Sequence, residues 1–109
     1  MKKFVFVFYG RVRPEDIKKE DMQKVMDAWM AWFGSFKDKM VDGGNPLASG
    51  AQAVTAKGVK TIATGASSAK GYTIINAKDM DEAVKIAKEC PVLKDDDEGT
   101  VHVYEALPM

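Results

Sequence analysis

Residues 4–9 read Phe4-Val5-Phe6-Val7-Phe8-Tyr9 and are followed by Gly10. Aromatic and β-branched residues favour the extended backbone of a strand, and the glycine ends it. Every side chain in this stretch is apolar, so neither face of the strand is suited to water. The sequence therefore predicts a strand that is covered on both sides.

A long helix is predicted after this strand, from Pro14 to about Met40. Apolar side chains recur there at helical spacing and form one stripe about 100° wide. The members of this stripe are Met22, Val25, Met26, Trp29, Phe33, Phe36 and Met40. Met30 and Trp32 lie on its opposite shoulders. Gly43-Gly44 supplies the left-handed residue that commonly ends a helix.

Weaker signals follow the helix. Residues 51–55 and 59–63 flank Lys57-Gly58 and are predicted to form a small hairpin. The segment from Gly65 to Gly71 holds no large apolar residue and is typical of a mobile loop. It matches no phosphate-binding loop, because its lysine precedes the second glycine and a strand follows.

The last third of the chain predicts a strand over residues 72–77, a short helix and a final strand over residues 100–106. Asp79, with Glu82 three residues later, gives an acidic capping box for the helix, which runs through Glu89 and stops at Pro91. The apolar face of this helix consists of Ala83, Ile86, Ala87 and Cys90. In the final strand, alternation puts Val101 and Val103 on one face and His102 and Tyr104 on the other.

This order of elements is interpreted as an α+β fold, a ferredoxin-like βαββαβ sandwich with an extra small hairpin. Two helices cover one face of the sheet in that fold, and no residues remain to cover the other. The apolar second face of the first strand therefore predicts a homodimer that packs sheet against sheet.

The composition of the chain limits the classes of function that this protein can have. The 109 residues fit a single domain, residues 1–109, and 16 basic with 16 acidic residues give a net charge of zero. Zero charge argues against nucleic acid or an anionic membrane surface as the main partner. The apolar run at residues 4–9 is too short for a signal peptide or a membrane span, so a cytoplasmic location is expected. The single cysteine, Cys90, excludes an internal disulfide and a thiolate metal site.

A wider pattern joins these segments. Phe4–Gly10, Trp29-x-x-Trp32, Gly43-Gly44-Asn45-Pro46-Leu47, Gly71-Tyr72-Thr73-Ile74-Ile75 and Gly99–Glu105 follow one another in an order that, with the capped helix ending at Cys90-Pro91, spans essentially the whole chain. This arrangement resembles the YCII-related (YciI-like) family of small proteins. The resemblance implies a dimeric α+β barrel, and it implies fold and dimerisation more than chemistry.

Two family features are absent. Many relatives carry Asp-Gly-Pro-Phe before the third core strand, where this chain has residues 64–70, Thr-Gly-Ala-Ser-Ser-Ala-Lys. Members closer to the family's namesake have a His–Asp pair with the histidine in the N-terminal half, whereas the only histidine here is His102. The resemblance therefore implies no catalytic residue for this chain.

Four residues are candidates for ligand binding: Trp32, Asn45, Tyr72 and His102. His102 suits general acid–base chemistry near neutral pH, or a hydrogen-bonded place in an interface, or exposure to solvent. Trp32 could line the mouth of a pocket or pack in the core. Asn45 could orient a ligand or satisfy backbone groups of a turn. The hydroxyl of Tyr72 could reach a cleft, or its ring could cover the core.

Other polar clusters are weaker. Arg11 and Arg13 could bind an anion at the end of the barrel or serve as surface charge. Residues 95–98, Asp-Asp-Asp-Glu, lack the ligand spacing of a calcium loop and predict a solvated turn. No metal site and no cofactor are predicted.

The sequence thus predicts a YCII-like homodimer of undefined activity. It would bind a small organic molecule in a cleft between sheet and helix or near the dimer junction. Two alternatives stay open: a cofactor-free, monooxygenase-like enzyme of the α+β-barrel type that uses His102 as acid or base, and a non-catalytic structural or regulatory dimer.

Overall fold

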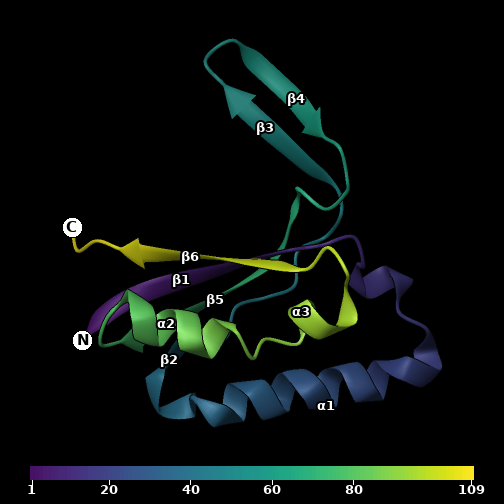
Figure 1. The fold of residues 1–109 in the computed structure, drawn as a ribbon. Helices are drawn as coiled ribbons and strands as arrows, with labels where there is room; N and C mark the ends of the chain where they lie inside the picture. The colour runs from purple at the N-terminus through teal and green to yellow at the C-terminus, as the bar shows by residue number, and fades with distance from the viewer.

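The aromatic stretch at the start of the chain forms β1 (Lys2–Tyr9), a central strand of a four-stranded antiparallel sheet. The computed structural model describes all of residues 1–109 and has an α+β fold (Figure 1). The strand order is β2-β5-β1-β6. The other three strands are β2 (Met40–Asp42), β5 (Ala69–Ala77) and β6 (Thr100–Ala106).

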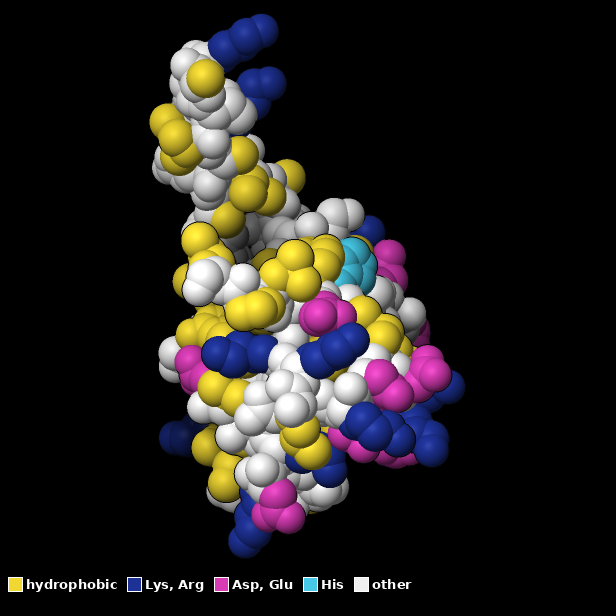
Figure 2. All heavy atoms as spheres, turned by 90° about the vertical axis from the view of Figure 1, so that its left-hand side faces the viewer, with side chains coloured by type: hydrophobic (Ala, Val, Ile, Leu, Met, Phe, Trp, Pro, Cys, Tyr) yellow, Lys and Arg dark blue, Asp and Glu magenta, His cyan; other side chains and the backbone are white.

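The predicted hairpin is confirmed as β3 (Ala51–Thr55) and β4 (Gly58–Ile62), which form a separate two-stranded sheet. It extends from the side of the main sheet opposite to the helices (Figure 1). Figure 2 shows it as a thin arm that projects from the body with hydrophobic side chains along it. The arm raises the radius of gyration to 14.8 Å, against about 13 Å for a compact chain of this length.

The helices are α1 (Lys19–Ser35), α2 (Met80–Ala87) and the single turn α3 (Val92–Asp95), with short 3₁₀ turns at Pro14–Asp16 and Lys37–Lys39. The predicted helix from Pro14 to Met40 is therefore too long at both ends. Gly34 and Ser35 are poor helix formers, and Phe36 leaves helical geometry with φ −135°. Met40 starts β2 and pairs with Ile75, so its apolar side chain belongs to the sheet.

Gly44 was predicted to end a helix, and this prediction is wrong because Gly44 follows the strand β2. Its φ of 74° is left-handed, and a Cβ there would lie 1.7 Å from the carbonyl oxygen of Tyr72. Only glycine allows the chain to pass this close to β5.

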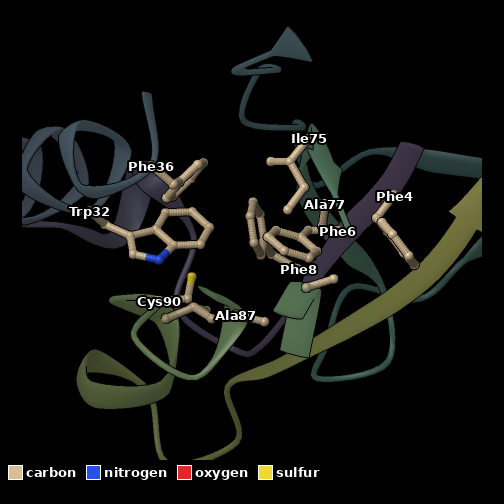
Figure 3. Packing of buried hydrophobic residues seen from close by; sticks show 11 residues of the cluster. Phe4, Phe6, Phe8, Trp32, Phe36, Ile75, Ala77, Ala87 and Cys90 are labelled. Atoms are coloured by element: carbon tan, nitrogen blue, oxygen red, sulfur yellow. The ribbon is translucent and has the colours of Figure 1, made fainter. Parts of the chain in front are cut away.

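The core lies between the sheet and the helices (Figure 3). The buried hydrophobic residues that form this core are Phe4, Phe6, Phe8, Trp32, Phe36, Ile75, Ala77, Ala83, Ala87, Cys90 and Val92. Trp32 stacks on Phe6 with ring centroids 6.0 Å apart, and its Nε1 donates to the carbonyl of Ile86 at 2.9 Å. The α1 indole is thus fixed to both β1 and α2.

The predicted stripe of α1 is only partly correct. Met22 and Met26 were expected in the core but are 36% and 55% exposed, whereas Trp32, expected on a shoulder, is 4% exposed. The reason is that the core includes α1 side chains only from its C-terminal end, where Trp32 lies, and from Phe36 just beyond it. The N-terminal half of α1 does not reach the core.

The capped helix α2 is confirmed. The carboxylate of Asp79 accepts a hydrogen bond from the backbone N–H of Glu82 at 2.9 Å, and the Glu82 carboxylate accepts one from the N–H of Lys78 at 3.0 Å. Ala83 and Ala87 pack on the sheet, as predicted. Their small side chains let α2 approach the phenylalanines of β1.

Candidate functional site

The main hollow of the molecule is a cleft of about 690 Å³ between α1 and the sheet. Its floor includes Phe8 of β1 and residues 71–73 of β5. One wall is α1, which contributes Met22, Val25, Met26, Trp29, Met30 and Phe33. The volume lies in the range of small-molecule sites, and methionine side chains adapt to ligands of varied shape.

The same side chains explain why the cleft exists. Because only the C-terminal end of α1 packs on β1, the apolar stripe continues beyond the core and faces the cleft. Trp29 marks the border, since its ring contacts Phe8 edge-on at 5.1 Å and also lines the cleft.

The opposite wall is the loop 43–46 after β2. The Thr73 hydroxyl donates to the carbonyl of Gly43 at 3.0 Å, and Pro46 forms a β-bridge with Gly71. These contacts and the close approach of Gly44 hold the loop on β5. Asn45 lies within this fixed loop, at the rim of the cleft.

A buried arginine lies at the polar end of the cleft. Arg13 is 2% exposed, and its guanidinium donates to the carbonyls of Ala69 (3.1 Å), Gly65 (3.0 Å) and Ser68 (3.1 Å). Surface charge is therefore a wrong interpretation for Arg13, although it fits Arg11, which is exposed and pairs with Glu98. The segment from Gly65 to Gly71, which was predicted to be a mobile loop, is therefore held by Arg13 at three backbone carbonyls.

Asp96 completes this end of the cleft. Its carboxylate accepts hydrogen bonds from the N–H of Val12 at 2.8 Å and the N–H of Glu98 at 3.0 Å, and it lies 3.5 Å from Nζ of Lys70. The predicted solvated turn at residues 95–98 thus contains one buried carboxylate, which ties α3 to the chain after β1. Local sequence could not distinguish it from its acidic neighbours.

The structure places the four candidate residues in different surroundings. Asn45 lines the cleft, and Trp32 lies in the core. Tyr72 borders the cleft, but it pairs with Val7 in the register of β1 and β5, so its side chain lies on the helix-free face of the sheet. His102 lies on that same helix-free face. There the His102 ring is 4.5 Å from the ring of Tyr9, and its Nδ1 is 3.4 Å from the hydroxyl of Tyr104.

The single thiol of the chain lies in the core. Cys90 is fully buried, and desolvation raises the pKa of its thiol to about 12, so the reactive thiolate is suppressed. No group of three His, Cys, Asp or Glu side chains is placed to hold a metal ion. What the cleft can do is enclose an apolar molecule and offer it polar groups at its end.

A second hollow, of about 480 Å³, lies where the hairpin meets the body. Its lining residues are Tyr9, Leu47, Ala48, Gly50, Ala51, Ile62, Ser67, Ser68 and Ala69. Most of these side chains are small or apolar, and no titratable pair faces this space.

No protein-family model and no curated protein matches the chain. Among the helices, none has the length and apolar character needed to span a membrane.

Proposed function

We propose that this protein is a small YCII-like homodimer that binds a small organic molecule in the cleft between α1 and the sheet. The observation that carries the proposal is the cleft wall itself. Six apolar side chains of α1 line an open space of about 690 Å³, and only two of them, Trp29 and Phe33, also pack against the core. Leaving so much apolar surface against water costs free energy that a bound apolar ligand would recover.

The strand order supports a ferredoxin-like arrangement with β1, β2, β5 and β6 as its four strands. The helix-free face of that sheet supports the homodimer. Val5, Val7 and Ile74 are only partly buried on this face, and no helix covers them. A second sheet packed on them would form the dimeric barrel.

The enzyme alternative with His102 as acid or base has less support. His102 is exposed and lies on the face of the sheet that the cleft does not touch. A general acid or base must reach its substrate within about 3 Å. Only a partner subunit would enclose His102, so this alternative needs a second site at the dimer junction.

A thermal-shift screen tests ligand binding. Apolar and amphipathic metabolites are added to the protein, and a ligand present at a hundred times its Kd should raise Tm by roughly 10 °C. Quenching of tryptophan fluorescence then reports on Trp29 in the cleft wall. A broad screen without a stabilising compound would favour the non-catalytic structural dimer.

A matched pair of variants locates the ligand. Met26→Asp puts a charge into the cleft wall at a residue that is 55% exposed, so folding should survive. It should weaken binding of any hit at least ten-fold. Met80→Asp makes the same change at a 41% exposed methionine outside the cleft and should leave binding unchanged. Equal binding by both variants would exclude the cleft as the site.

A further inference from the structure

We infer that the β3–β4 hairpin is a clasp that packs against a second copy of this chain on the open face of the main sheet. The open face is the helix-free side that carries Val5, Val7, Ile74, His102 and Tyr104. The inference rests on the homodimer of the proposed function. It deepens that proposal by assigning the element that holds the partner.

The hairpin has almost no support within its own chain. All five residues of β4 are exposed, and the cross-strand pair Val54 and Val59 is 78% and 59% exposed. An isolated two-stranded hairpin is at best marginally stable in water. A surface outside this chain would supply the free energy that β3 and β4 lack along the arm.

The base of the hairpin is anchored on both stems. On the incoming stem, the Ser49 hydroxyl donates to the carboxylate of Glu15 at 2.6 Å. The Thr64 hydroxyl of the outgoing stem donates to the carbonyl of Ser49 at 3.0 Å, and Arg13 binds the carbonyls that follow. These contacts fix the direction of the arm. Ordering both stems costs conformational entropy, which a contact made further along the arm would offset.

The fixed direction is toward the open face. The hairpin extends from the same side of the sheet on which Val5, Val7 and Ile74 lack cover (Figure 1). The hollow of about 480 Å³ occupies the corner between arm and body, and Tyr9 and Ile62 are among the residues that line it. Figure 2 shows a hollow where the arm meets the body, with hydrophobic side chains along the arm and around the hollow.

A second copy is the occupant that fits this surface. Each copy offers one arm and one open face on the same side, so a two-fold rotation brings each arm onto the partner's body in an isologous contact. The net charge of zero means that no electrostatic repulsion opposes self-association. The arms would then add apolar area to the contact between the two sheets, with Val54 and Val59 as buried residues.

The deciding variant is Val54→Thr combined with Val59→Thr. Threonine keeps the β-branched shape and strand propensity but replaces a methyl group by a hydroxyl. The dimer dissociation constant, measured by sedimentation equilibrium, should rise at least ten-fold. Val12→Thr makes the same change at a valine that is 38% exposed on the helix side, and it should leave the constant unchanged. Circular dichroism checks that all proteins fold.

Hydrogen exchange gives a second readout. Amides of residues 51–55 and 58–62 should be protected above the dissociation constant of the wild-type dimer and exchange freely far below it. A wild-type chain that stays monomeric at all concentrations would overturn both the homodimer and the clasp. A stable dimer whose hairpin amides exchange freely, and whose affinity the double variant leaves intact, would overturn the clasp alone.

Discussion

The two faces of the main sheet differ in burial, although side chains of the same strand, β1, contribute to both. On β1, Phe4, Phe6 and Phe8 are 0–4% exposed beneath the helices, whereas Val5 and Val7 between them are only partly buried. Both sets are apolar, so hydrophobicity does not separate them. The two sets differ because the connections between the strands place their helices over only one face of the sheet.

The handedness of those connections puts both helices on one side. β1 and β2 are each antiparallel to β5 and hence parallel to one another, and β5 and β6 are likewise each antiparallel to β1. A crossover between parallel strands is right-handed in nearly all proteins. The crossovers through α1 and α2 therefore cover the same face and leave the other face bare.

The largest expected effect tests this contrast directly. Trp32→Ala removes a 4% exposed indole from the covered face and should lower the free energy of unfolding by about 3–5 kcal/mol. Tyr104→Ala on the open face removes a ring that is 52% exposed, and in dilute, monomeric protein it should cost less than about 1 kcal/mol. Urea denaturation monitored by circular dichroism measures both. Equal losses would show that the two faces do not differ as described.

The next largest loss of stability is expected at the base of the hairpin, which Arg13 anchors. Arg13→Met leaves the carbonyls of Gly65, Ser68 and Ala69 without their donor and should cost about 2–3 kcal/mol. Arg11→Met, two residues away at an exposed ion pair, should change stability by less than about 0.5 kcal/mol. Thermal unfolding of the two variants gives the comparison. A small effect at Arg13 would mean that the base of the arm is not held by this side chain.

A smaller effect comes from Cys90 on the covered side. Burial raises its pKa from 9.0 to about 12, so folding stability is complete below pH 9 and decreases as the pH rises toward 12. The loss should be about 1.5 kcal/mol at pH 10, because the unfolded chain releases the thiol proton and the folded chain does not. Cys90→Ala should not show this step. Native-state labelling by a thiol reagent should be slow at pH 8, and rapid labelling would contradict the burial of Cys90.

The smallest effect tests the cap that positions α2 over β1. Asp79→Ala removes the acceptor for the N–H of Glu82 and should cost about 1 kcal/mol. Asp81→Ala, in the first turn of the same helix, removes a charge but no cap and should cost less than half of that. Denaturant midpoints distinguish the two. If Asp81 proved the more costly loss, the dipole and not the capping bond would stabilise this helix end.

The sequence predicted well those elements whose signals are local. The cap at Asp79, the hairpin and the alternation of residues 100–106 each depend on a few neighbouring residues, and each is confirmed, although the hairpin turn lies at Ala56-Lys57, one residue before the predicted Lys57-Gly58. The second strand was missed because Met40 fits a helical stripe as well as a strand. Its pairing with Ile75 is a contact between distant residues that local pattern does not contain.

The candidate site shows the same limit. An apolar stripe has the same spacing whether it faces a core or a cleft, so Met22 and Met26 were assigned to the core. Arg13 has no sequence signal that distinguishes it from Arg11, because its partners are backbone carbonyls from 52 to 56 residues away. Of the residues singled out as ligand-binding candidates, Asn45 lies at the cleft, whereas the register of β5 places the Tyr72 side chain on the helix-free face with His102.

By itself the sequence determined that both faces of β1 are apolar and that one short chain has two helices to cover them. Tertiary structure decided the rest: which face the helices cover, how far α1 stands off from the sheet, and which way the hairpin extends. These depend on crossover handedness and on contacts between residues far apart in the chain. Periodicity identifies the apolar face of a helix or strand. Only the folded chain shows whether that face packs against a core, a cleft or nothing in its own chain.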